Sequence, residues 1–380
     1  MPHVLTITPF YPRGGNETRG CFIAEPLTDL IRAGLESTVF AVEPVYRTAP
    51  RASASAPVAN WYRYPSLPGG LGLASAGFGL FWRLRGPAIA LHKESRIGLI
   101  HAHGPLPCGH AAWLLSRYLK IPYVASVHGL DAFSSMQVNG APGEWCRRVS
   151  QIVFQSARRV IGVSRRVCEE IEKGVAGGVA TTVVYNGVDE TLFTPGPEGP
   201  TPTLLTVGNL IPGKGHELVL RSLAALRPDF PRLTWEVIGD GPELENLCRL
   251  ARELGVTGNT RLLGRRSRPA IAEACRRCTV FVLPSRSEGL GCVYLEAMSC
   301  GRPVVACQGQ GIAEVIRQGE NGWLIPPGGQ AELIAGLRTL LGDLEGRARM
   351  GTAARQTILD GFTLRHQALR LKAIYRECAG

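Results

Sequence analysis

The stretch Leu283–Cys307, LPSRSEGLGCVYLEAMSCGRPVVAC, predicts a short buried strand, a glycine turn, a helix that begins near Cys292, and a second buried strand. Gly289 and Gly291 permit a tight turn and a close approach of backbone to a ligand. The amide groups and the positive dipole end of the following helix make a binding site for an anion such as phosphate. The stretch therefore predicts a strand–helix–strand unit of a parallel sheet with a phosphate site at its turn.

Two carboxylates flank this turn, Glu288 before it and Glu296 eight positions later in the predicted helix. A carboxylate beside a phosphate site is unfavourable unless it accepts hydrogen bonds from hydroxyl groups, which ribose and hexose rings supply. The pattern therefore favours a sugar nucleotide as ligand. In the alternative reading, Glu288 is an ordinary acid at a helix N-terminus and Glu296 is a solvated surface residue.

The same alternation of strands and helices extends over the whole chain, which favours an α/β fold with two doubly wound, Rossmann-like sheets facing a cleft. The proline-rich break TPGPEGPTP, residues 194–202, is typical of a linker. We expect an N-terminal domain over residues 1–195, a linker over 196–202, a C-terminal domain over 203–362, and a closing helix over 363–380 that packs back on the N-terminal domain. The predicted strands are 4–7, 38–42, 99–102, 123–127, 160–163, 182–185, 203–207, 234–238, 261–263, 280–283, 303–306 and 323–325, and the clearest helices are 217–226, 242–254 and 269–277.

A glycine loop lies between a predicted strand and helix in Thr203–Leu220, TLLTVGNLIPGKGHELVL. Gly208 to Lys214 matches the GxxxxGK part of a phosphate loop, but Gly215 replaces the Ser or Thr that would hold magnesium. A nucleoside triphosphatase is therefore disfavoured. Lys214 remains a cation that could face a diphosphate, and its alternative is an ordinary surface lysine.

Two features of the first half are weaker. In YVASVHGLDAF, residues 123–133, His128 follows a strand, at the edge where parallel sheets bind ligands. An imidazole there can donate to a substrate oxygen, although a lone histidine is more often structural. The loop from Thr8 to Phe22 carries Gly14, Gly15 and Gly20 before a helix near Cys21, which suits a phosphate or sugar but equally a plain turn.

Composition narrows the function further. The 380 residues carry a net charge of +11, spread evenly along the chain, which is compatible with phosphate-bearing substrates or an anionic membrane surface. No basic run interleaved with aromatic residues favours nucleic acid. The chain has no DxD sequence for a divalent ion and no GxGxxG after the first strand for a nicotinamide cofactor. The CxxC of Cys275 and Cys278 has no second pair, so no metal site is predicted.

Eleven unpatterned cysteines are typical of reduced thiols in a cytoplasmic protein, and the N-terminus does not resemble a signal peptide. The uncharged, glycine-rich stretch from Tyr64 to Trp82 is expected to be a mobile or interfacial loop.

The chain resembles the retaining glycosyltransferases of family 4, also called glycosyl transferases group 1, which have the GT-B fold. The most specific match is E-x7-E, here Glu288 to Glu296, followed by AMSCGRPVVA. Further matches in the same order along nearly the whole chain are SVHGLD (126–131), GVSRRV (162–167), VVYNGVDETLFTP (183–195), VGNLIPGKG (207–215), IGDGPELENL (238–247) and GIAEVIRQGENGWLIPP (311–327).

The resemblance implies roles for particular residues. Glu288 would accept from hydroxyls of the donor sugar, Glu296 would hold the ribose, and Lys214 would neutralise the leaving diphosphate. The backbone of Gly289, Leu290, Gly291 and Cys292 would hold a phosphate, Gly20 would open a helix that faces the diphosphate, and His128 would lie near the sugar or the acceptor. Many members carry Arg where this chain has Asn209, so one donor-binding cation is missing, with Arg265 and Arg266 as candidate replacements.

The expected function is transfer of a hexose from a UDP- or GDP-sugar to a glycan or a lipid-linked saccharide, with retention of configuration and without a metal or other cofactor. The expected location is the cytoplasm, with peripheral attachment to the inner face of the membrane. Two alternatives of the same architecture are a nucleotide-sugar epimerase, which needs no acceptor, and a non-catalytic nucleotide-sugar-binding protein.

Overall fold

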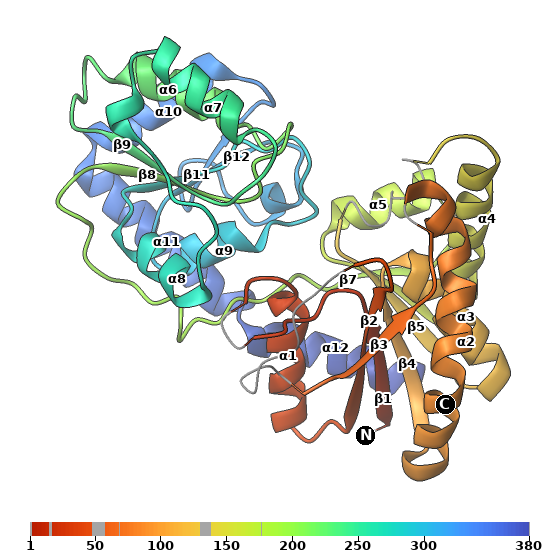
Figure 1. The fold of residues 1–380 in the computed structure, drawn as a ribbon. Coiled ribbons are helices and arrows are strands. Elements are labelled where there is room, and N and C mark those ends of the chain that lie inside the picture. The colour runs from red at the N-terminus through yellow and green to blue at the C-terminus, as the bar shows by residue number, and fades with distance from the viewer. Residues whose placement is uncertain are drawn as a thin grey trace. The chain divides into compact units, whose positions relative to one another are not determined.

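The computed structural model describes residues 2–14, 17–47, 58–67, 69–129, 138–175 and 177–379. The chain divides into two compact units, one of residues 1–185 with 365–380 and the other of residues 186–364. Each unit is a parallel sheet with helices on both faces (Figure 1). Among the described residues, no helix has both the length and the apolar character that crossing a bilayer requires.

Unit 1 contains a seven-stranded parallel sheet within its described residues, in the order β3-β2-β1-β4-β5-β6-β7. The order reverses between β1 and β4, so the carboxyl ends of these two strands flank a topological switch point, where open α/β sheets bind ligands. Its elements are β1 (His3–Thr8), α1 (Cys21–Arg32), β2 (Ser37–Pro44), β3 (Asn60–Tyr64), α2 (Gly69–Ser95), β4 (Ile97–His103), α3 (His110–Leu119), β5 (Tyr123–Val127), α4 (Gly140–Ser156), β6 (Arg159–Gly162), α5 (Arg165–Gly174), β7 (Thr181–Val183) and, from the end of the chain, α12 (Leu364–Cys378).

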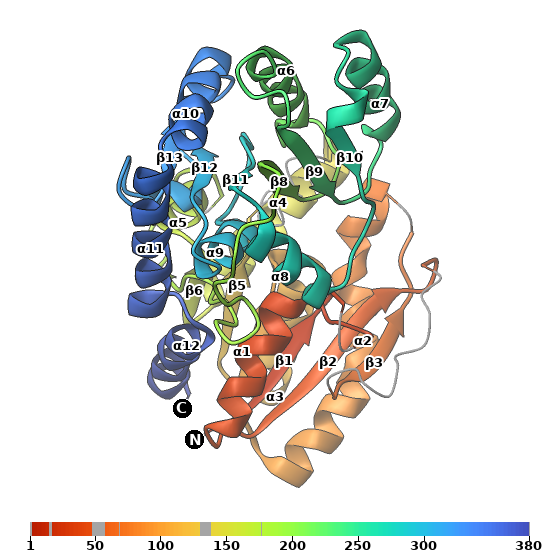
Figure 2. The same ribbon diagram turned by 90° about the vertical axis from the view of Figure 1, so that its left-hand side faces the viewer.

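Unit 2 contains a six-stranded parallel sheet in the order β10-β9-β8-β11-β12-β13, with its own switch point between β8 and β11. Helices α6, α7 and α10 cover one face of this sheet, and α8, α9 and α11 cover the other (Figures 1 and 2). Its elements are β8 (Thr203–Val207), α6 (His216–Leu226), β9 (Thr234–Ile238), α7 (Leu244–Glu253), β10 (Thr260–Leu262), α8 (Arg268–Arg277), β11 (Val280–Val282), α9 (Cys292–Ser299), β12 (Val304–Cys307), β13 (Trp323–Ile325), α10 (Gln330–Gly342) and α11 (Leu344–Gly361).

The expected α/β class with two doubly wound sheets is confirmed, because both sheets are parallel throughout and both have the Rossmann strand order. The central strands are apolar over their whole length because both of their faces are buried. In β11, for example, Val280, Phe281 and Val282 are all fully buried. Strands of this kind could be located from sequence to within about two residues.

Two expectations about unit 1 are wrong. The strand Asn60–Tyr64 is missing from the sequence prediction, because this edge strand NWYRY is only partly buried and carries a charge. The stretch from Tyr64 to Trp82 is not a loop along its length, since α2 begins at Gly69. Its glycines are tolerated because Ala76, Leu80 and Leu84 recur every fourth residue and are buried.

The proline-rich segment 196–202, which the sequence analysis treats as a linker, lies against unit 2. The carboxylate of Glu198 forms ion pairs with Arg302 at 3.2 Å and with Arg347 at 3.1 Å. The amide of Gly199 donates to the carbonyl of Arg277 at 2.9 Å. Charge pairing and backbone hydrogen bonds therefore hold this segment, although its composition is typical of a free connection.

Residues 186–195 also belong to unit 2, which begins at Asn186 rather than after residue 195. Phe193 is fully buried, and its carbonyl accepts from the hydroxyl of Ser299 at 2.7 Å. At the other end of the chain, α12 belongs to unit 1 from Arg365 onward, where Leu371, Ile374 and Tyr375 share a core with residues of α1 (Figure 2).

Candidate functional site

The switch point of unit 2 brings two predicted residues into contact. Lys214, in the loop after β8, donates from Nζ to Oε1 of Glu288, in the loop after β11. Their side chains are 18% and 13% exposed, so the pair is shielded from most solvent. Although they are 74 residues apart in sequence, they meet because β8 and β11 are neighbours and both loops leave the carboxyl edge of the sheet.

The two loops are locked together by their backbones. The amide of Arg286 donates to the carbonyl of Gly213 at 2.8 Å. Gly215, with φ +79°, ends the first loop and caps α6, and a Cβ there would lie 2.4 Å from the carbonyl oxygen of Pro284. Only glycine permits this approach, so the glycine next to Lys214 positions the lysine against the second loop.

Backbone hydrogen bonds of Glu288 tie it to the segment that follows β12. Its amide donates to the side-chain oxygen of Gln310 at 2.9 Å, and its carbonyl accepts from the amide of Gly311 at 3.4 Å. Gln310 follows β12 and is 5% exposed. This supporting residue was missed, because an isolated glutamine 22 positions away carries no local signal.

The predicted phosphate site lies directly after Glu288. Gly291, with φ +81° and ψ +83°, caps the N-terminus of α9, which starts at Cys292 as expected. A Cβ at Gly291 would meet the ring of Tyr294 at 2.6 Å, so a larger residue would displace the turn. Leu290 is buried and Cys292 is half-buried. The helix directs its positive dipole end into the region of the Lys214–Glu288 pair, an arrangement suited to a phosphate.

Glu296 is buried rather than solvated, with 4% exposure. Its Oε1 accepts from Nη1 of Arg268, which is 5% exposed and also stacks over the ring of Phe193 at 4.9 Å. The burial of Glu296 contradicts the alternative of a solvated surface residue, and its partner Arg268 was missed. The sequence RSRP around Arg268 shows only a helix start and gives no sign of a partner 28 residues away.

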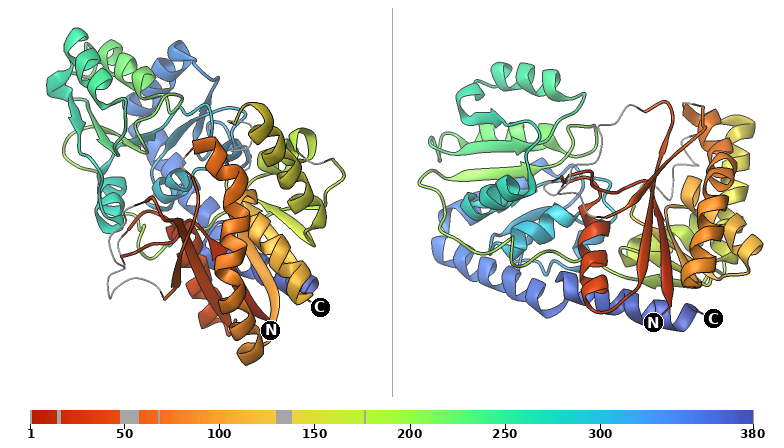
Figure 3. Two further views of the ribbon diagram at one scale, coloured as in Figure 1. Left: turned by 45° about the vertical axis from the view of Figure 1, so that its right-hand side comes forward. Right: turned by 60° about the horizontal axis from the view of Figure 1, so that its bottom comes forward.

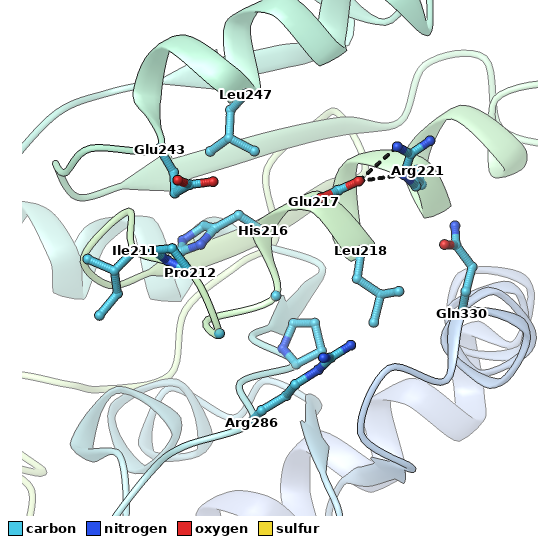
Figure 4. A pocket seen from close by; sticks show the side chains of 13 residues that line it. Ile211, Pro212, His216, Glu217, Leu218, Arg221, Glu243, Leu247, Arg286 and Gln330 are labelled. Atoms are coloured by element: carbon cyan, nitrogen blue, oxygen red, sulfur yellow. Dashed lines mark hydrogen bonds and ion pairs between the residues drawn. The ribbon is translucent and has the colours of Figure 1, made fainter. Parts of the chain in front are cut away.

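Asn209 is exposed beside this edge of the sheet. Of the two candidate replacement cations, Arg265 is 74% exposed and lies 3.9 Å from the carboxylate of Asp240. Arg286 is a further cation close by, in the same loop as Glu288. It lines a pocket of about 390 Å³ on the outer flank of the glycine loop, together with Pro212, His216, Pro284 and Gln330 (Figure 4). Lys214 and Glu288 do not line this pocket.

His128 and Gly20 belong to unit 1, and they too lie at the carboxyl edge of their sheet. Gly20 caps α1 with φ +77°, and a Cβ there would lie 2.6 Å from the backbone of Phe10 and Tyr11. The ring of Phe22, in the first turn of α1, lies 4.8 Å from the ring of His128. Gly15 of the preceding loop and residues 130–131 of the SVHGLD motif are outside the described residues.

His128 is part of a buried histidine cluster that the sequence analysis missed. Its Nε2 lies 2.8 Å from Nδ1 of His103, at the end of β4, so one ring donates and the other accepts. The ring of His101 lies 4.2 Å from that of His103, measured between centroids, and is tilted by 34°. His101 also forms hydrogen bonds with the hydroxyls of Tyr375 and Ser126, both at 2.7 Å. The HAH sequence at the end of β4 was a usable signal, because residues two apart share one face of a strand.

Burial keeps these rings neutral. Desolvation lowers the pKa of His128 to about 4 and that of His101 to about 3, with a smaller contribution from His128 to the latter. The pKa of His103 is lowered well below its ordinary value by the same cause. At neutral pH His128 can thus donate or accept one hydrogen bond without carrying charge. Among the described residues, no group of three or more His, Cys, Asp or Glu side chains could hold a metal ion.

Comparison with known proteins identifies the family of this chain. The family model described as "Glycosyl transferases group 1" matches residues 188–357, and that described as "Glycosyltransferase Family 4" matches residues 23–192. A D-inositol 3-phosphate glycosyltransferase of Stackebrandtia nassauensis is 31% identical over 313 residues, which cover 76% of this chain and 70% of that protein.

Two solved structures resemble the chain over 99% of its length. Sucrose-phosphate synthase from Thermosynechococcus elongatus aligns with a TM-score of 0.83 at 20% identity, and 99% of that chain is covered. Anabaena HepE, solved in complex with UDP-glucose, aligns with a TM-score of 0.77 at 20% identity, and 100% of that chain is covered. At these identities the likeness concerns the fold.

Proposed function

This chain belongs to the group 1 glycosyltransferases of family 4, and from that premise we propose that it transfers a hexose from a UDP- or GDP-sugar to a glycan or lipid-linked saccharide, with retention of configuration. The observation that carries the proposal is the contact of Lys214 with Glu288 beside the N-terminus of α9, at the switch point of unit 2. A cation, a carboxylate and a helix dipole at one place match the parts of a sugar diphosphate.

The reaction breaks the bond between the anomeric carbon and the diphosphate oxygen. Negative charge grows on the leaving diphosphate while the sugar becomes oxocarbenium-like, so stabilisation of that charge lowers the barrier. Lys214 and the α9 N-terminus supply it. Lys214 must exchange its carboxylate partner for the diphosphate when the donor binds, because one ammonium group cannot neutralise both fully.

The carboxylates recognise hydroxyl groups in this scheme. Glu288, released from Lys214, accepts from hydroxyls of the donor sugar. Glu296 accepts from the ribose through Oε2 while Arg268 holds Oε1. A carboxylate has lone pairs for several donors, so these contacts are compatible with the ion pair. His128, neutral at the edge of unit 1, provides a hydrogen bond to the sugar or to the acceptor hydroxyl.

Retention would follow from attack on the same face as the departing diphosphate, whose oxygen takes the proton of the acceptor hydroxyl. NMR of the product decides this point. An α-linked donor should give an α-linked product, and an inverted linkage would rule out same-face attack.

The donor can be found with purified protein and a panel of nucleotide sugars. HepE was solved with UDP-glucose, and we extend a uridine or guanosine diphosphate donor to this chain. We expect one UDP- or GDP-sugar to raise the melting temperature, and release of free nucleotide diphosphate to require an added acceptor. Conversion of the sugar without acceptor would indicate an epimerase, and no response to any nucleotide sugar would contradict the donor site.

The acceptor is assigned to unit 1. A glycan or a saccharide carried on a lipid at an anionic membrane face suits the net charge of +11. This acceptor requires the protein to be in the cytoplasm and attached peripherally to the inner face of the membrane. Cell fractionation tests it, since the protein should sediment with membranes and be released by high salt.

A further inference from the structure

Unit 1 exposes a group of aromatic side chains on the helices that cover one face of its sheet. Helices α2, α3 and α4 lie together on that side, as the orange-to-yellow ribbons in the right panel of Figure 3 show. We define the aromatic face as Phe78, Phe81, Trp82, Tyr118 and Trp145.

Ring contacts join three of these residues, Phe81, Trp82 and Tyr118. The ring of Phe81 lies 5.6 Å from that of Trp82 and 6.4 Å from that of Tyr118. Trp145 of α4 reaches α2, where its indole nitrogen donates to the carbonyl of Ala74 at 3.0 Å. Three helices therefore contribute to the aromatic face.

The aromatic face is more exposed than folding requires. Trp82 is 64% exposed, Phe78 46%, Tyr118 48% and Trp145 44%. A single exposed aromatic residue is ordinary, but a contiguous group of them marks an interaction site. The core of unit 1 does not need this surface, because α2 already buries its other face against the sheet.

The buried face of α2 limits how this helix can bind a membrane. Ala76, Leu80, Leu84 and Ala88 recur every fourth residue and are at most 3% exposed. Because these side chains are committed to the core, α2 can lie on a bilayer with its outer side but cannot enter it as a spanning helix.

Arg85 lies within the aromatic face, and Arg83 and Arg117 are next in sequence to Trp82 and Tyr118. The guanidinium of Arg85 lies 5.4 Å from the ring centroid of Trp82 and 4.6 Å from that of Tyr118, and it donates to the Tyr118 hydroxyl at 2.9 Å. Arg83 on α2 and Arg117 on α3 are exposed.

Acidic residues are few there. Glu94, near the end of α2, is the one acid in the sequences of α2 and α3. Glu144, next to Trp145, is paired with Arg147 at 2.7 Å. The surface is therefore both aromatic and positive.

We propose that the aromatic face docks this protein on an anionic lipid surface. Tryptophan and tyrosine rings favour the headgroup region, where an apolar ring meets a polar edge, and arginine side chains extend to lipid phosphates. Negative lipids attract the surrounding arginines. A partner protein would need acidic and apolar side chains arranged to match this surface. A bilayer of anionic lipids presents negative headgroups and an apolar interior together.

The inference rests on the proposed function in one respect, since a lipid-linked acceptor gives the docking surface its use. Its test needs neither donor nor acceptor. If the protein binds vesicles through this face but turns over no nucleotide sugar, the proposed function fails and the docking surface stands. If turnover is found and vesicles are not bound, the reverse holds.

The test is sedimentation of the full chain with vesicles of phosphatidylglycerol and phosphatidylcholine, compared with phosphatidylcholine alone. We expect binding to the anionic vesicles, weakened by salt. Replacing Phe78 and Trp82 together by Ser should lower the partition coefficient by at least about tenfold. The matched control is Leu344→Ser, which removes a side chain that is 67% exposed in unit 2 and should leave binding unchanged.

The conservative variant Trp82→Phe tests directly whether the aromatic face contacts the bilayer. Trp82→Phe should still bind, but it should lose part of the fluorescence quenching that brominated lipids cause in the parent protein. Melting temperatures near that of the parent show that the variants are folded. Absence of affinity for anionic vesicles, unchanged binding of the Phe78/Trp82 variant, or a dimer in solution that protects Trp82 would each overturn the proposal.

Discussion

Lys214 and Glu288 form an ion pair across the switch point of the second sheet, with both side chains less than one-fifth exposed. We proposed that Lys214 binds the diphosphate of the donor and that Glu288 binds its sugar. In this structure the two side chains bind each other. The ion pair neutralises two largely buried charges, and burying either of them without a partner would cost free energy. In the proposed reaction, Lys214 exchanges this carboxylate for the diphosphate when the donor binds.

Lys214→Ala should lower kcat by about a hundredfold, because one positioned cation stabilises the leaving diphosphate in the transition state. The control is Arg221→Ala, which removes an exposed cation of α6 that pairs with Glu217 at 2.8 Å. Steady-state kinetics with the identified donor provides the measurement. A near-parental rate for Lys214→Ala would contradict the role of the lysine.

Glu288→Gln should separate binding from turnover. It removes the competitor for Lys214, so UDP should bind more tightly in calorimetry. The same change weakens the acceptor of sugar hydroxyl bonds, so kcat should fall by at least about tenfold. Weaker UDP binding together with unchanged kcat would show that Glu288 neither opposes the diphosphate nor holds the sugar.

Arg268→Met should destabilise unit 2 by about 3–5 kcal/mol, because it leaves the carboxylate of Glu296 buried without its partner. Arg338→Met is the matched control, since its 2.9 Å pair with Asp229 is about half exposed and should be worth at most about 1 kcal/mol. Urea unfolding measures both. Restored stability in Arg268→Met with Glu296→Gln would identify the buried charge as the cause, and equal losses in the two single variants would refute it.

The histidine cluster should make unit 1 sensitive to acid. The pKa of His128 falls from 6.5 when unfolded to about 4 when folded, so the unfolded chain binds the extra proton between these values. This contribution to stability is complete above pH 6.5 and is lost as pH falls toward 4, at about 1.4 kcal/mol per pH unit for each such histidine. Urea midpoints at pH 7.5, 6.0 and 5.0 test it. His103→Asn should flatten the dependence, and a midpoint that does not change with pH would contradict the assignment.

Activity should survive treatment with a chelator, because the proposed scheme neutralises the diphosphate with Lys214 and the α9 dipole alone. The measurement is the initial rate after dialysis against EDTA, with and without added magnesium. Complete loss in EDTA that magnesium restores would require a metal on the diphosphate.

The sequence by itself determined the α/β class and most of the strands, because a strand buried on both faces must be apolar throughout. It also determined the glycine turn at Gly291 and the start of α9 at Cys292, since a left-handed cap and a helix N-terminus are local features. The sequence-based prediction failed for α2, because its high glycine content obscured the helical spacing of its buried residues. The glycines of α2 suggested a loop, although the alanines and leucines every fourth residue predict a helix.

Only the tertiary structure decided which polar side chains meet. Arg268 for Glu296, Gln310 for Glu288 and His103 for His128 are partners 22 to 28 residues away. They lie on or next to neighbouring elements of each unit, and the sequence does not record which side chains of two neighbouring elements face one another. A sequence records which groups can ionise or donate. Their energies depend on burial and on the group opposite, and these arise only when the sheet is assembled.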